Sequence, residues 1–255
     1  AILDRIHRLN PKLLAFYLIE DESAMAAARA SEARWMNGAP TGPLDGVPVS
    51  IKDSIAVAGR PMYRGSKAYA PATPSPTDAP PAARLREAGT ILLGKTTMPD
   101  LGCLASGISS QHGTARNPWN LARTPGGSTS GGAAAVAAGL GPLTVGTDLG
   151  GSVRIPAAFC GLVGLKPTQG RIPHTPPSSM RSAGPLARTV ADAVLMTAVL
   201  SQPDRSDCLS LPFPPPPARP AQAPEDVVRG VRIGLLLDAG AGTAVGADIR
   251  AAVEK

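Results

Sequence analysis

Apolar residues along the chain fall into short segments with two kinds of spacing. They recur at helical spacing, or in alanine-rich runs, in segments 24–35, 80–88, 133–138 and 189–200, and a last helix is expected to begin at 247 and run to 255. In segment 47–53 β-branched residues alternate with other residues, as they do in a strand, and the mainly apolar segments 90–93 and 231–237 are also expected to be strands. Because strands and helices alternate, the sequence predicts an α/β fold with a layered sheet.

Turn-forming and capping residues mark the boundaries of these segments. Ser23 is the expected N-cap of the first helix, and Gly89 ends the second. Residues 42–46 (GPLDG) form a turn before the strand 47–53. The proline-rich stretch 212–224 is expected to be a connecting loop, its alternative role being to bind the groove of a partner. The strand 231–237 that follows is expected to lie in the centre of the sheet.

The composition predicts a core that contains few aromatic residues. Apolar residues make up 43% of the 255 residues but aromatic residues only 3%, so Ala, Val, Leu and Ile must fill the core, packed closely with the help of 28 glycines. The net charge of +6 comes from basic residues that are scattered singly. With so few aromatic platforms for bases to stack on, we expect no nucleic-acid binding.

The sequence indicates neither a membrane protein nor a disulfide-linked secreted one. No uninterrupted apolar stretch is long enough to cross a bilayer, and residues 1–5 (AILDR) do not follow the signal-peptide pattern. Cys103, Cys160 and Cys208 are odd in number and far apart, which predicts reduced thiols and no zinc site. We therefore expect a cytoplasmic protein that does not bind membranes.

The two ends of the sequence predict an incomplete domain. The chain begins without methionine and stops inside a strand-then-helix unit. A sheet cut at that point would leave an apolar face or an edge uncovered. We expect a single domain over residues 1–255 that is truncated at its N-terminus and lacks its C-terminal part.

Two serines that follow glycine pairs are the candidate nucleophiles. Ser128 follows Gly126 and Gly127, and Ser152 follows Gly150 and Gly151. Glycines let the backbone adopt conformations closed to other residues, so such a loop can aim several N–H groups at one point. Those donors would stabilise the oxyanion that forms when a carbonyl is attacked. The expected donors around Ser152 are the N–H groups of Leu149, Gly150, Gly151 and Ser152 itself.

A serine nucleophile also needs a base. His7, His112 and His174 are the only histidines, and none lies in a segment that resembles a catalytic loop. Lys52 ends an apolar strand, where burial would disfavour its charged form and lower its pKa. On its own this residue could equally be a surface lysine at a strand end.

The order of these segments resembles that of the amidase signature family of hydrolases. The resemblance rests on residues 46–53 (GVPVSIKD), 117–120 (NPWN), 126–128 (GGS) and 150–156 (GGSVRIP), and it is clearest between about residues 34 and 200. A long ordered string of this kind is far more specific than one short motif. The resemblance implies a mixed central sheet with helices on both faces.

The resemblance also implies a mechanism. By position, Lys52 matches the family's base, Ser128 its bridging serine and Ser152 the serine that is acylated. The bridging serine follows a cis peptide bond, here Gly127–Ser128. The implied activity is hydrolysis of the carboxamide C–N bond of a small-molecule amide, without metal or cofactor. Whether the protein forms a homo-oligomer stays open.

Two other functions remain as alternatives. Residues 89–96 (GTILLGKT) satisfy the P-loop pattern GxxxxGK[ST] of nucleotide-binding proteins, although a P-loop should follow a strand, whereas this run follows a predicted helix. The second alternative is a subunit that acts only within a larger complex, such as the glutaminase subunit of a tRNA-dependent amidotransferase, or an inactive fragment.

Residues close to Ser152 have simpler structural interpretations. Gly150–Arg154 lacks the second glycine of a GxSxG nucleophile elbow, so an ordinary α/β-hydrolase is not expected. Asp148 and Arg154 flank the serine and are expected to pair and hold the loop. Cys160 lies in an apolar run beside Phe159 and is expected in the core.

Overall fold

The computed structural model describes residues 1–212, 229–232, 234–237, 240, 242 and 244–254. The chain divides into two compact units, residues 1–219 and residues 220–255. The first unit contains the sheet and the candidate site. In the described part of the second unit, the helix α8 (Ala247–Val253) is the regular element, within the segment 247–255 predicted to be helical.

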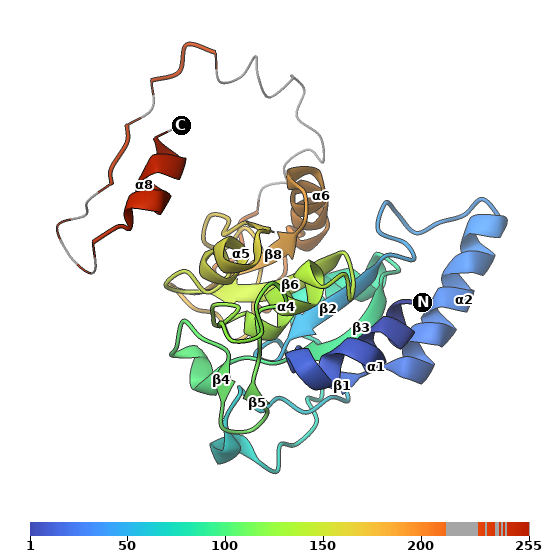
Figure 1. Cartoon of the computed structure of the whole chain (residues 1–255). Helices are drawn as coiled ribbons and strands as arrows, with labels where there is room; N and C mark the ends of the chain where they lie inside the picture. Colours follow the sequence, from blue (N-terminus) through green and yellow to red (C-terminus); the bar gives the residue numbers. More distant parts are fainter. Residues whose placement is uncertain (213–228, 233, 238–239, 241, 243, 255) are drawn as a thin grey trace. The chain divides into compact units, whose positions relative to one another are not determined.

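A mixed six-stranded sheet forms the centre of the first unit (Figure 1). In spatial order its strands are β1 (Phe16–Ile19), β3 (Ile91–Thr96), β2 (Pro48–Lys52), β6 (Leu143–Asp148), β8 (Ser182–Ala187) and β7 (Val163–Gly164). β2 runs parallel to both β3 and β6, and the outer strands pair antiparallel to their neighbours. The predicted fold class is confirmed, and the predicted strands 47–53 and 90–93 are β2 and the first part of β3.

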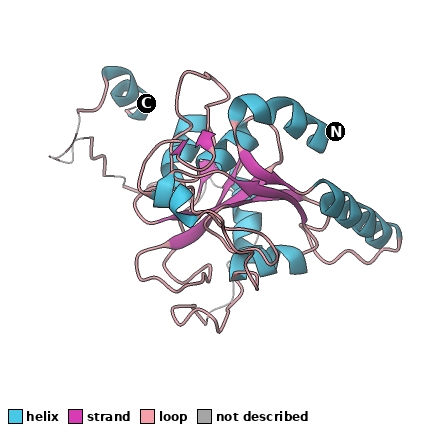
Figure 2. Cartoon of the chain, turned by 90° about the horizontal axis from the view of Figure 1, so that it is seen from below, coloured by secondary structure: helices cyan, strands magenta, loops and turns pink. Residues whose placement is uncertain are grey.

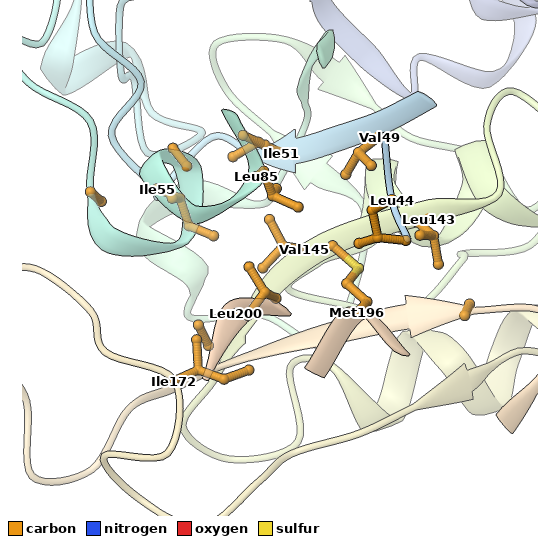
Figure 3. Packing of buried hydrophobic residues seen from close by; sticks show 14 of the residues in the cluster. Leu44, Val49, Ile51, Ile55, Leu85, Leu143, Val145, Ile172, Met196 and Leu200 are labelled. Atoms are coloured by element: carbon orange, nitrogen blue, oxygen red, sulfur yellow. The ribbon is translucent and has the colours of Figure 1, made fainter. Parts of the chain in front are cut away.

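Helices cover both faces of this sheet (Figure 2). One face packs against α3 (Pro80–Glu87) and α6 (Val190–Leu200), where Leu85 and Met196 meet Val49 and Val145 (Figure 3). The other face packs against α1 (Ile2–Leu13), α4 (Ser130–Ala137) and α5 (Arg154–Cys160). The helix α2 (Asp21–Met36) lies beside β3. Every predicted helix is therefore present.

Four short elements lie in the loops of the first unit. The strands β4 (Ile108–Ser109) and β5 (Gly113–Thr114) pair antiparallel, and one 3-10 turn, η1, spans Lys67–Tyr69 and the other, η2, spans Asp100–Gly102. No helix among the described residues is long and apolar enough to cross a membrane.

The strand β2 carries apolar residues on one face and polar residues on the other. Val49 and Ile51 belong to the core beneath α3 and α6. Successive side chains of a strand point to opposite faces, so Ser50 and Lys52 project toward the α4 side. There the Ser50 hydroxyl donates a hydrogen bond to Thr144 Oγ1 at 2.8 Å. The central strand thus delivers a polar row to the face on which the site is built.

Two predicted helix starts were wrong. Ser23 lies inside α2, which begins at Asp21, and its hydroxyl donates to the Glu20 carboxylate instead of capping a main-chain N–H. α4 begins at Ser130 and not at 133, because Gly131 and Gly132 lie within the helix. A side chain at Gly131 would fall 2.2 Å from the main-chain oxygen of Ala15, so glycine lets α4 approach the sheet closely.

The predicted central strand 231–237 is wrong in its described residues, 231–232 and 234–237, which form no strand. A strand is stable only when a neighbouring strand pairs with its N–H and C=O groups. The described residues of the second unit contain no such neighbour. The proline-rich loop 212–224 lies outside the described residues, except for its first position.

Candidate active site

Lys52 lies at the end of β2 and is completely buried. Its amine donates hydrogen bonds to Ser128 Oγ at 2.8 Å and to Thr147 Oγ1 at 3.0 Å. Burial, assisted by the charge of Arg181 and opposed by the carboxylates of Asp148 and Asp53, lowers the pKa of Lys52 to about 7. The structure therefore holds at this point an amine that is uncharged in a large fraction of molecules near neutral pH.

Ser128 lies in the turn that leads into α4 and is almost completely buried. The peptide bond between Gly127 and Ser128 is cis, as the resemblance implied. A side chain at Gly127 would lie 2.5–2.6 Å from the main-chain oxygens of Leu104 and Ser106, so only glycine fits beneath that loop. The glycine before Ser128 is thus required by close packing.

Ser152 lies in the loop between β6 and α5, and a main-chain hydrogen bond joins this loop to the other serine loop. The N–H of Thr129 donates to Ser152 O at 3.1 Å. The two glycine–glycine–serine turns, separated in the sequence by α4 and β6, are therefore side by side.

Asp148 fixes the backbone around Ser152. Its carboxylate accepts N–H groups from Gly151 at 2.8 Å and Val153 at 3.0 Å, and the Arg154 guanidinium at 2.9 and 3.0 Å. Burial acts to raise the pKa of Asp148, but these donors together hold it well below its usual range. The expected pairing of Asp148 with Arg154 is confirmed.

The Asp148 contacts divide the N–H groups of the loop into two sets. Because the N–H of Gly151 points to Asp148, it is not free to serve as an oxyanion donor, and Gly151 does not line the cavity. The N–H groups of Leu149, Gly150 and Ser152 donate to no partner among the described residues. Of the four donors expected from the sequence, these three remain available.

The predicted residues meet at one cavity of about 450 Å³. Lys52, Ser128, Leu149, Gly150 and Ser152 all line it. Gly127, the glycine before Ser128, and Cys103, one of the three thiols, line it as well. The rest of the described lining comes from residues that the sequence analysis did not single out: Ser54, Met98, Leu101, Gly102, Leu104, Ala105, Thr147, Ile155 and Arg181.

Two of the missed lining residues bear on function. Thr147 lies in β6, just before the motif 150–156, so its place in the site could have been noticed from the sequence. Arg181 lies far beyond that motif, just before β8, and no local pattern marks it.

The histidines lie outside this cavity, and all three are among the described residues. His7 contacts Asp21 at the surface, and His112 stacks on Tyr17. Burial lowers the pKa of His174 to about 3. The described residues contain no cluster of three side chains that could hold a metal ion.

The three cysteines are free, and Cys160 is buried as expected. Burial raises the pKa of its thiol to about 12, which disfavours the thiolate form that a nucleophile requires. Its thiol faces the main-chain oxygen of Pro125. Cys160 therefore belongs to the core beside the site.

The P-loop alternative is wrong. Residues 91–96 of its motif form the strand β3, and Lys95 and Thr96 are buried within the sheet. The amine of Lys95 donates to the main-chain oxygen of Asp53 at 3.0 Å. A phosphate-binding loop needs its N–H groups free at a helix N-terminus, and here they belong to a paired strand.

Comparisons with known proteins agree with this arrangement. The family model described as Amidase matches residues 1–255. A curated relative, a subunit of glutamyl-tRNA(Gln) amidotransferase from Acidothermus cellulolyticus, is 44% identical over 92% of this chain and 47% of its own length. The chain thus spans about half the length of the curated relatives it matches.

Solved structures show the same similarity. Native peptide amidase from Stenotrophomonas maltophilia superposes with a TM-score of 0.78 and 35% identity, over 86% of this chain and 47% of that chain. A bacterial aryl acylamidase, described as belonging to the amidase signature enzymes, superposes with a TM-score of 0.77 and 35% identity, over 84% and 45%.

Proposed function

The chain belongs to the amidase family, the amidase signature hydrolases that its motifs resemble, and on that premise we propose that it hydrolyses a carboxamide C–N bond. In this proposal Ser152 becomes acylated, Ser128 relays protons and Lys52 is the base. The observation that carries it is the 2.8 Å contact between the Lys52 amine and Ser128 Oγ, in the cavity that Ser152 also lines.

The first half of the reaction forms an acyl-enzyme. Neutral Lys52 takes the proton of Ser128 as Ser128 takes the proton of Ser152, and the Ser152 oxygen attacks the carbonyl carbon. The N–H groups of Leu149, Gly150 and Ser152 stabilise the negative charge on the carbonyl oxygen. Each donor of this kind typically contributes about 3 kcal/mol to the transition state.

The second half releases both products. The protonated Lys52 returns its proton through Ser128 to the leaving nitrogen, the C–N bond breaks, and the amine departs. Water then attacks the Ser152 ester, with the same relay removing its proton, and the carboxylic acid is released. In these steps every proton is carried by Lys52, Ser128, Ser152 or water.

The names of the curated relatives favour a second candidate function. Each is named as a subunit of glutamyl-tRNA(Gln) amidotransferase, at 41–44% identity, which makes the side-chain amide of glutamine a candidate substrate within a larger complex. Ammonia release from glutamine, compared with release from simple aliphatic amides, distinguishes this role from that of a stand-alone amidase.

The substrate class, the cellular compartment and the oligomeric state are part of the same proposal. We expect a small-molecule amide as substrate and the reducing cytoplasm as compartment, a setting supported by the three free cysteines. A homo-oligomer is a further expectation that size-exclusion chromatography with light scattering tests.

A serine-directed fluorophosphonate tests the mechanism directly. The protein expressed from its complete gene should be labelled on Ser152, as mapped by peptide mass spectrometry. Ser152→Ala should abolish labelling, and Lys52→Ala should slow it by about 10³-fold, in the range of general-base effects.

Ser130→Ala is the matched control for this experiment. Ser130 lies close to Ser128 in the sequence, at the start of α4, but its hydroxyl has no hydrogen-bond partner among the described residues, and the residue does not line the cavity. Its variant should label as the wild type does. Labelling of another serine, or none in a folded protein, would count against the proposed function.

A further inference from the structure

Arg181 lines the catalytic cavity and has no acidic partner among the described residues. The residue is partly exposed, and one of its terminal nitrogens donates to the main-chain oxygen of Pro176 at 3.2 Å. Its Nε is buried and makes no hydrogen bond in the described structure. No carboxylate in the described part of the chain lies within ion-pair distance of this guanidinium.

Three other partly buried arginines of the first unit each pair with a carboxylate. Arg34 pairs with Asp45, Arg60 with Glu20, and Arg84 with Asp204. An arginine that is partly desolvated normally finds a carboxylate, because its charge is costly to remove from water without one. Arg181 departs from this pattern at the wall of the cavity that Lys52, Ser128 and Ser152 line.

The groups around Arg181 add further positive charge and do not balance the charge of its guanidinium. Arg64 lies close enough for its charge to lower the pKa of Arg181 in addition to the larger effect of burial, and the Nε of Arg64 is likewise without a partner in the described structure. His174 is buried nearby and stays neutral, since its pKa falls to about 3. The described lining of the cavity contains Lys52 and Arg181 and no carboxylate.

We propose that Arg181 binds a carboxylate of the substrate, so that the amide hydrolysed here carries a free carboxylate, as the monoamide of a short dicarboxylic acid does. This inference rests on the proposed function and names its substrate class. A guanidinium presents paired N–H groups that match the two oxygens of a carboxylate, and the partly dry cavity strengthens that pairing. The carboxylate would supply the counter-charge that the chain's described residues do not.

Two pairs of amides test this inference. Succinamate and glutaramate carry a carboxylate at the end opposite the amide, and succinamide and glutaramide replace that carboxylate by a neutral group of the same shape. We expect the wild type to hydrolyse the charged member of a pair with a kcat/KM at least about 30-fold higher, in line with a partly desolvated charge pair.

Substitution of Arg181 should remove this preference selectively. Arg181→Gln should lower kcat/KM for succinamate and glutaramate by about 100-fold and leave the neutral diamides within about threefold. Arg181→Lys should recover part of the loss, because it keeps the charge but not the paired geometry. Assays at about pH 9 keep Lys52 uncharged in every variant, so that effects on the base do not enter. Arg123→Gln, at an exposed arginine outside the cavity, is the matched control.

The outcomes separate this inference from the function on which it rests. If Ser152 is labelled by fluorophosphonate but the wild type shows no preference for the charged amides, the carboxylate role of Arg181 is refuted and the hydrolase stands. Equal losses on charged and neutral amides in Arg181→Gln would also refute it, since they indicate a structural role. Failure to label Ser152 in the folded wild type would instead refute the proposed function.

Discussion

Lys52 and Lys95 lie on neighbouring parallel strands and are both buried, yet they have different surroundings. Lys52 ends β2, and Lys95 sits in the adjoining strand β3, opposite Ile51. Burial lowers the pKa of both amines, to about 7 for Lys52 and about 8 for Lys95. By burial and pKa alone, either residue would be a candidate base.

Their hydrogen bonds separate them. The Lys52 amine contacts the hydroxyls of Ser128 and Thr147 at the wall of the cavity. The Lys95 amine instead contacts the main-chain oxygens of Asp53 and Pro61, at 3.0 and 3.4 Å, and does not line that cavity. A hydroxyl can give up a proton to an amine, whereas a carbonyl oxygen has none to give.

The comparison shows that a lowered lysine pKa does not identify a base by itself. What distinguishes Lys52 is its contact with a hydroxyl, that of Ser128, at the wall of a cavity large enough for a small substrate. The amine of Lys95 instead holds the main-chain oxygen of Asp53, in the turn after β2, against the sheet, which is a structural role. Three experiments sharpen this distinction.

The largest difference should appear in activity. If Lys52 is the base, as proposed, Lys52→Met should lower kcat/KM for amide hydrolysis by about 10³–10⁴-fold, because the proposed proton relay loses its acceptor. Lys95→Met, a change of the same shape one strand away, should cost less than about tenfold. Steady-state ammonia release measures kcat/KM for both variants. Comparable losses of kcat/KM in the two would show that Lys52 has no special role in the reaction.

Stability should rank the two variants in the opposite order. Lys95→Met leaves the main-chain oxygen of Asp53 buried without its donor, which should lower the free energy of unfolding by about 1–3 kcal/mol. Lys52→Met frees the hydroxyls of Ser128 and Thr147, but these line the cavity, where water can replace the amine, so stability should change by less than about 1 kcal/mol. Urea denaturation followed by circular dichroism measures both values; a Lys95→Met protein as stable as wild type would contradict the structural role.

The smallest effect should be in the pH profile. Only neutral Lys52 can act as base, so kcat/KM should fall with decreasing pH around its pKa of about 7. Arg181→Gln removes a positive charge that lowers this pKa, so its acid limb should move to higher pH. Lys95→Met should leave the limb where it is. A neutral amide is used as substrate, so that ionisation of the substrate does not affect the profile. If the acid limb of Arg181→Gln does not move, the charge of Arg181 does not influence Lys52.

Much of the fold could be predicted from local pattern, and the failures have physical causes. The strand β2 was found from its alternating β-branched residues, whereas β8 was missed because Gly184 and Pro185 interrupt it. α1 was missed because Pro11 lies within its last turn. The glycines of α4 were taken for a turn, since their use in close packing becomes visible only when the sheet is in place.

The candidate site depended on different information. Lys52, Ser128 and Ser152 were identified by the order of a long motif, because no local pattern shows that three distant segments converge. Arg181 could not be found, since its segment reaches the cavity only through the pairing of β8 with β6. Gly151 was assigned as a donor because the direction of an N–H group depends on its partner, Asp148, and sequence does not display that direction.

The hydrogen bonds of Asp148 have a consequence for how this scaffold diversifies. The donors to its carboxylate lie three to six residues further along the chain. The loop that carries Ser152 is therefore held mainly by a carboxylate from the strand directly before it, with one further main-chain hydrogen bond from Thr129. None of the hydrogen bonds to Asp148 involves residues 98–105, so side-chain substitutions in that wall are expected to alter the shape of the cavity while these bonds stay in place.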